Sequence, residues 1–151
     1  MQGADLEQHI GYMLKWAQHA LRMHMADALR ALGTTAAQYA ALGVLAESPG
    51  LSGAELARRC FVTPQSMNAI VVSLEAAGLV ARSPHPVHGR IIETSLTEAG
   101  RKLLDWGNRA VWEVERKMLD GLSTQDSAML LDLLRRCTTN LEPERRQASH
   151  E

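Results

Sequence analysis

Two consecutive helix signals, joined by a short turn, constrain the fold of this chain more than any other feature of its sequence. The second signal has Thr63 as a helix cap, Pro64 at the first helical position and Gly78 just beyond the last turn. The first signal begins with Ser52 and places Glu55 three residues later, which is the spacing of a capping box. Together they predict a short helix, a tight turn and a second helix, the order of a helix-turn-helix.

The residues after this pair of helices change from helical to strand-like spacing. The β-rich runs LVARS at 79–83 and RIIETSL at 90–96 flank the loop PHPVHG at 84–89, which contains two prolines and a glycine. They predict a hairpin with an extended tip. Because a hairpin directly after a helix-turn-helix forms a wing, the middle of the chain is predicted to be a winged helix-turn-helix.

Further helices are predicted on both sides of this segment. Apolar residues recur at steps of three and four from Leu6 to Leu32, which predicts one long amphipathic helix. Thr35 can cap the next helix, and two more apolar stripes follow Thr97 and Ser123, which can cap them. The fold class is therefore expected to be mainly α, with long helices at both ends of the chain.

The helix that follows Thr63 has a predicted outward face suited to DNA bases. Its positions with core spacing are Met67, Ile70, Val71 and Leu74. The side chains left outside are Gln65, Ser66, Asn68, Ala69, Val72 and Ser73. In a helix-turn-helix the second helix enters the major groove, where Gln and Asn pair with adenine and Ser pairs with several bases. The alternative interpretation is an ordinary polar, solvated surface.

Positive charge is placed beside this helix instead of on it. Arg58 and Arg59 end the preceding helix, Arg82 begins the hairpin and Arg90 follows its tip loop. Because phosphate contacts position a protein while base contacts specify the sequence, flanking arginines can hold a weakly charged reading helix. Arg90 could enter a narrow minor groove, although ordinary surface ion pairs are the alternative for Arg82 and Arg90. A net charge of −1 argues against a protein that coats nucleic acid through bulk charge.

The stretch 51–104 resembles the DNA-binding lobe of the MarR-type regulators, small dimeric winged-helix transcription factors. The resemblance lies in the pattern ELARR…TPQS…LEAAGLV…R…LTEAG. The chain departs from the family's usual wing, which carries Asp-x-Arg, because it has His88-Gly89-Arg90 at those positions. His85 stands at another position that is often Asp in the family, and Ala69 and Ser73 stand where Arg is often found.

The resemblance implies a division of labour along the chain. It implies a helical dimerisation lobe from 1–34 and 98–142, a winged-helix DNA-binding lobe at 35–97, and a polar tail at 143–151 that we expect to fray. The expected DNA-binding residues are Arg58, Thr63, Gln65, Ser66, Asn68, Ala69, Ser73, Arg82, His85, His88 and Arg90.

The resemblance also implies partners. These are a second copy of the chain, in a homodimer, and double-stranded DNA with a pseudo-palindromic operator, usually under repression. In many such regulators a small aromatic or lipophilic ligand releases the DNA from a cleft between the lobes. Trp16, His19 and Tyr39 are candidates for the wall of that cleft, since Trp and Tyr combine an apolar body with one polar group.

The wing histidines suggest a hypothesis of pH dependence. An unperturbed histidine titrates near pH 6.5. Protonated His85 or His88 would add positive charge beside the DNA backbone, so operator affinity should rise as the pH falls through that range. The alternative is that both histidines are spacers.

Metal sensing and thiol sensing are alternative mechanisms of regulation. His19 and His24 are five residues apart and cannot share one helical face well, so a local metal site is not predicted. Cys60 follows two arginines, which would favour a thiolate. Its spacing, and the apolar stripe that contains Cys137, nevertheless predict buried, unreactive cysteines.

Other classes of protein find little support in the sequence. No catalytic triad order, glycine-rich phosphate loop or metal quartet occurs at useful spacing, so neither an enzyme nor a cofactor is expected. Apolar runs are too short for a membrane helix, and two cysteines imply no disulfide framework, which together favour a cytoplasmic protein. A winged helix that binds another protein instead of DNA is the remaining alternative.

Overall fold

The computed structural model describes residues 6–142, which belong to two compact units divided after Glu115. The sequence placed its boundaries elsewhere, around a winged helix at 35–97, and that division into lobes stays a prediction. Among the described helices, none is both long and apolar enough to cross a membrane.

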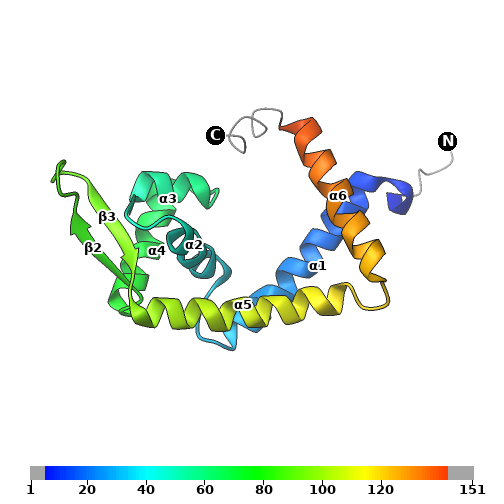
Figure 1. Cartoon of the computed structure of the whole chain (residues 1–151), viewed down its shortest axis with the longest axis horizontal. Coiled ribbons are helices and arrows are strands. Elements are labelled where there is room, and N and C mark those ends of the chain that lie inside the picture. Colours follow the sequence, from blue (N-terminus) through cyan, green and yellow to red (C-terminus); the bar gives the residue numbers. More distant parts are fainter. Residues whose placement is uncertain (1–5, 143–151) are drawn as a thin grey trace. The chain divides into compact units, whose positions relative to one another are not determined.

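The first unit contains a long helix, a winged helix-turn-helix and most of a second long helix (Figure 1). Its elements are η1 (Leu6–Gln8, a 3₁₀ turn), α1 (Ile10–Arg30), α2 (Ala36–Glu47), β1 (Leu51–Ser52), α3 (Gly53–Arg59), α4 (Pro64–Ala76), β2 (Val80–Pro84), β3 (Ile92–Leu96) and α5 (Glu98–Met118). The sheet is antiparallel with the order β1-β3-β2, so β2 and β3 form the predicted wing. The mainly α, winged-helix fold is thereby confirmed.

The helices of the winged helix begin at the caps that the sequence indicated. Thr35 and Ser52 each form a complete capping box with the side chain three residues on. Thr63 Oγ1 accepts a hydrogen bond from the Ser66 backbone N–H at 3.1 Å. Since these contacts are local, they define the starts of α2, α3 and α4 directly from the sequence.

The prediction of one unbroken helix from Leu6 to Leu32 is wrong at its start. A 3₁₀ turn occupies Leu6–Gln8, and α1 begins only at Ile10 because His9 has an extended backbone. The His9 side chain does not cap the helix, and Gly11 in the first turn is a poor helix former. The apolar spacing therefore continues across the boundary between the 3₁₀ turn and α1, and the spacing alone does not reveal that boundary.

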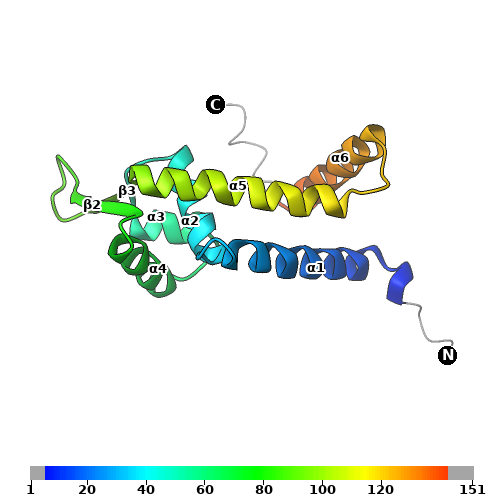
Figure 2. The same ribbon diagram turned by 90° about the horizontal axis from the view of Figure 1, so that it is seen from below.

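The core of the winged helix lies between α2, α3, α4 and the sheet. Its large side chains that are fully buried are Leu42, Leu45, Leu56, Met67, Leu74 and Thr94. On α4, Met67, Val71 and Leu74 are buried and Ile70 packs against them half-buried, as predicted. Figure 2 shows the wing projecting past this core, with α4 next to β2.

The turn between α3 and α4 has a conformation that the sequence did not indicate. Phe61 has a φ angle of 56°, in the left-handed region, and its side chain is 80% exposed. Such a conformation costs a non-glycine residue about 1–2 kcal/mol. The turn imposes it, because the Val62 N–H bonds to the carbonyl of Ala57 at 3.1 Å.

The second unit contains the end of α5 and helix α6 (Thr124–Leu141), which begins at the predicted cap Ser123. In this unit, as far as the structure describes it, no residue of α6 is buried. Its exposed apolar side chains are Met129, Leu130, Leu131, Leu133, Leu134 and Leu141. Cys137 is exposed as well, so its predicted burial is wrong, because nothing within this unit covers the apolar stripe.

Candidate nucleic-acid interface

The outward face of α4 is exposed along its whole length. Its side chains are those the sequence placed outside: Gln65, Ser66, Asn68, Ala69, Val72 and Ser73. Two of them have local partners, since Thr63 Oγ1 donates to Ser66 Oγ at 2.9 Å and Gln38 Nε2 donates to Ser73 Oγ at 2.9 Å. Within the described part of the chain, no hydrogen bond engages the side chain of Gln65 or Asn68. These amides are available to an external partner.

A hollow of about 300 Å³ is lined by residues of α3, α4 and the wing strands β2 and β3. Asn68 of α4 and Arg82 of β2 both line it, so it joins a predicted base-reading residue to a predicted backbone contact. The hollow also reaches Pro64, at the start of α4. Amide and guanidinium donors at one concavity suit an anionic, hydrogen-bonding partner such as a DNA strand.

Arg82 is not a free cation. Its Nε donates to Glu75 Oε2 at 2.7 Å, and one terminal nitrogen lies 2.5 Å from the same oxygen. The pair joins α4 to β2 and carries no net charge. The structure thus matches the ion-pair alternative for Arg82, whose remaining N–H groups could still donate to a phosphate. Glu75 is a part of the site that the sequence analysis missed.

Arg58 and Arg59 lie exposed at the end of α3. Arg59 donates to Ser48 Oγ at 2.7 Å and is thereby turned toward the end of α2. The backbone and hydroxyl hydrogen bonds of Ser52 lower the pKa of Glu55, with smaller contributions from the two arginines. Within the described residues, the Arg58 side chain has no hydrogen bond or ion pair of its own, unlike that of Arg59.

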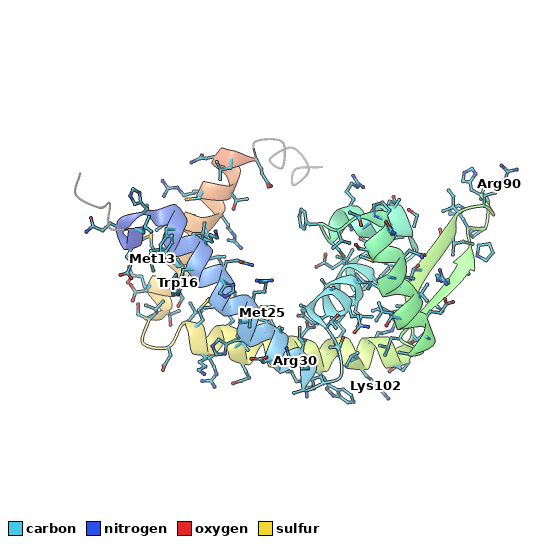
Figure 3. The ribbon with its side chains drawn as sticks, turned by 180° about the vertical axis from the view of Figure 1, so that it is seen from behind. Met13, Trp16, Met25, Arg30, Arg90 and Lys102 are labelled. Carbon is cyan, nitrogen blue, oxygen red and sulfur yellow. The ribbon has the colours of Figure 1, made fainter. Side chains whose placement is uncertain are left out.

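The wing tip is built around two histidines and an arginine. His85 Nδ1 accepts hydrogen bonds from the backbone N–H groups of Val87 and His88, and its ring lies 5.2 Å from that of His88. Arg90 is exposed at the far end of the wing, and its side chain points away from the strands (Figure 3). The structure therefore places Arg90 at the wing tip, and its contact with a groove stays a prediction.

Comparisons with known proteins agree with this arrangement. A family model described as MarR family matches residues 32–91. The HTH-type transcriptional repressor Rv2887 of Mycobacterium tuberculosis is 40% identical over 114 residues, which are 76% of this chain and 82% of the relative. The chain belongs to the MarR family of transcriptional regulators.

Solved structures extend the comparison to most of this MarR-family chain. The Rv2887 complex with DNA has a TM-score of 0.75 at 34% identity and covers 85% of this chain and 97% of that one. The Rv2887 complex with salicylic acid has a TM-score of 0.72 at 36% identity and covers 85% and 96%. The curated relatives are regulators of transcription.

The candidate ligand residues of this MarR-family protein do not all lie together. Trp16 and His19 line a hollow of about 540 Å³ on α1, and the residues that share it are Tyr12, Lys15, Gln18 and Arg22. Tyr39 lies elsewhere: its hydroxyl donates to Asn108 Oδ1 at 2.8 Å, and burial raises its pKa. The two cations in this hollow were missed, although Lys15 and Arg22 are seven residues apart and share a helical face with His19, which lies between them at steps of four and three.

The sensing alternatives gain no support from the described residues of the MarR-family chain. Among residues 6–142, no group of three or more potential ligands could hold a metal ion. Cys60 packs against the core, as its spacing predicted, but it is half-buried instead of buried; this burial raises the pKa of its thiol. A raised pKa reduces the thiolate fraction, which is the reactive form.

Proposed function

We propose that this protein binds duplex DNA as a homodimer on a pseudo-palindromic operator and represses transcription. The observation that carries the proposal is the exposed, polar and uncharged face of α4, next to a wing that ends in Arg90. A helix of this kind fits the major groove, where it is held through contacts outside its own surface. The similar protein Rv2887 has been solved in complex with DNA, which supports DNA as the partner of this chain.

The proposed roles divide the predicted residues into two groups. Gln65, Ser66 and Asn68 read base edges, while Thr63 holds Ser66 in place and Ala69 contacts a base methyl.

Arg58 and Arg90 contact the DNA backbone or minor groove, and Arg82 contributes N–H donors rather than net charge. Ser73 is a weaker candidate, since its hydroxyl already accepts from Gln38.

The proposal of a homodimer rests on apolar side chains that each unit leaves exposed. On α1, Ile10 is 82% exposed and Trp16 is 62% exposed, and α6 presents the leucine-rich face described above. Monomeric proteins rarely expose large contiguous apolar patches unless another chain covers them. Two copies related by a twofold axis would place two α4 helices on half-sites one helical turn apart.

The decisive experiment is the selection of binding sites from random duplexes at moderate salt. The expected result is an enriched inverted repeat, bound by a dimer with an affinity that falls steeply as salt rises. Absence of any enriched sequence, or a monomer on the selected site, would contradict the proposal. A salt-insensitive interaction with another protein would instead favour a winged helix used as a protein-binding module.

Replacing Arg90 by alanine should weaken binding to all duplexes by similar factors. Because Arg90 is proposed to contact backbone or minor groove, the slope of log affinity against log salt should decrease by about one per subunit. Fluorescence anisotropy on cognate and scrambled duplexes at several salt concentrations measures both quantities. A loss confined to the cognate duplex would assign Arg90 to base reading instead.

A second proposal concerns an aromatic carboxylate as the effector. The α1 hollow combines the rings of Tyr12 and Trp16, 5.9 Å apart, with the cations Lys15 and Arg22. Such a surface suits a ligand with an apolar ring and a negative charge. The similar protein Rv2887 was crystallised with salicylic acid, which has this chemistry.

Salicylate is therefore expected to release the protein from its operator. Arg22→Gln should raise the half-maximal salicylate concentration about tenfold, since a charge-assisted hydrogen bond is lost. Arg30→Gln is the matched control, because Arg30 lies on the same helix but pairs with Asp27 at 2.7 Å. If both variants had the same half-maximal salicylate concentration, the α1 hollow would not be the effector site.

A further inference from the structure

The loop at the tip of the wing is closed by its own backbone. The His85 N–H donates to the Ile91 carbonyl at 2.8 Å, and the Ile91 N–H donates to the His88 carbonyl at 2.8 Å. These bonds close residues 85–91 between β2 and β3 and carry Arg90 on the returning side. These two bonds do not engage the backbone N–H groups of Val87 and His88, which therefore need another acceptor.

The His85 side chain supplies that acceptor. Its Nδ1 lies 3.0 Å from the backbone nitrogen of Val87 and 3.0 Å from that of His88. A backbone N–H can only donate, so Nδ1 must hold its lone pair toward both groups. The proton of the neutral ring is then on Nε2, which lies 3.4 Å from Glu93 Oε1 on β3.

We propose that His85 is a positioning residue for DNA binding, and that its neutral Nε2–H tautomer holds the wing loop which presents Arg90. This inference rests on the proposed function, because it assigns Arg90 a contact with DNA. The two backbone N–H groups that Nδ1 accepts fix the tautomer of the ring and hold the loop. Glu93 Oε1 lies 3.4 Å from the opposite ring nitrogen, which carries the proton in this tautomer.

The proposal opposes the idea that His85 acts through positive charge. A protonated Nδ1 would direct a third N–H at the two backbone donors, and the loop contacts would be lost. The titratable groups that contact this ring from the described elements are Glu93 on β3 and His88 in the loop. Glu93 Oε1 faces Nε2, the nitrogen that carries the proton in the neutral tautomer. The charge hypothesis is then confined to His88.

Four substitutions separate position from charge. His85→Ala removes the acceptor and should weaken operator binding about tenfold, the equivalent of two neutral hydrogen bonds. His85→Asn should bind within about twofold of wild type, since an Asn side chain accepts from backbone N–H groups two or three residues on. His85→Arg adds charge without an acceptor and should also bind more weakly. Val87→Ala, in the same loop with a 78% exposed side chain, is the control that should match wild type.

A double-mutant cycle with Arg90 tests whether His85 acts through the arginine. In the Arg90→Ala background, His85→Ala should change affinity by less than about twofold, because the residue it positions is gone. A loss as large as in the wild-type background would overturn the positioning role. Tighter binding by His85→Arg would overturn it as well, since charge would then outweigh the loop contacts.

The state of the ring can be measured without DNA. Side-chain ¹⁵N shifts of the full-length protein at neutral pH should show an unprotonated Nδ1 and a protonated Nε2 at His85, and a protonated Nδ1 would overturn the proposal. If wild-type protein bound no duplex at all, the proposed function would fail, and the role of His85 in binding with it. The nitrogen shifts distinguish that failure from a failure of the loop contact.

Discussion

Replacing Gly100 by alanine is expected to lower the free energy of unfolding by about 3 kcal/mol or more. A Cβ at this position would lie 2.0 Å from the carbonyl oxygen of Leu79, which is backbone and cannot rotate away. The same carbonyl accepts the Thr97 N–H at 3.1 Å, so the start of α5 is joined tightly to the end of the helix-turn-helix. The variant must separate these segments to accommodate one methyl group.

Gly43→Ala is the matched control for this prediction. Gly43 is also within a helix, but a Cβ there meets nothing within 4 Å, so alanine should be neutral or stabilise by about 0.5–1 kcal/mol. Urea unfolding at one fixed protein concentration measures both variants, since association of subunits also changes apparent stability. Equal stability of Gly100→Ala and wild type would show that the contact with Leu79 is not as close as the structure has it.

Local signals account for the parts of the fold that the sequence predicted well. Thr63, Ser52 and Ser123 cap their helices through residues three positions away, so the information lies in adjacent sequence. The inward face of α4 follows from helical periodicity in the same way. Gly100 lies within a motif quoted from the sequence, yet its contact with Leu79 required the two segments to be placed in space.

Contacts between elements account for most of what the sequence did not predict at the site. The ion pair between Glu75 and Arg82 joins a helix to a strand and neutralises an arginine that was predicted to bring positive charge to the DNA, while its contact with phosphate stays a prediction. Tyr39 was grouped with Trp16 by chemistry, whereas its partner is Asn108 on α5. The exposure of Cys137 has another origin, because the sequence shows an apolar stripe but not whether the same chain covers it.

Two side chains of the wing-tip loop, those of His85 and Arg90, show the same limit within one short segment. The position of Arg90 at the tip follows from two strand-like runs with a loop between them. The role of His85 does not follow from the sequence. A histidine in a loop is interpreted as a surface charge until the direction of its hydrogen bonds is known. Sequence reasoning therefore located the wing and assigned one of its side chains to electrostatics where the geometry favours positioning.

Replacing Asn68 by alanine is expected to remove discrimination at one base pair in each half-site. Asn68 is exposed on α4, its side chain makes no hydrogen bond within the described residues, and it lines the hollow beside the wing. A bidentate amide contact to a base contributes about 1–3 kcal/mol, so a dimer that loses two should lose about 2–6 kcal/mol on its operator.

The pattern of loss matters more than its size. Affinities for a set of duplexes, each changed at one symmetric pair of positions, should show that the variant tolerates every base at one position and remains selective at the others. Arg90→Ala, measured on the same duplexes, should weaken all of them alike, because a backbone contact carries no sequence information. If Asn68→Ala instead weakened cognate and scrambled duplexes equally, Asn68 would be a backbone contact, and the outward face of α4 would not be what reads the operator.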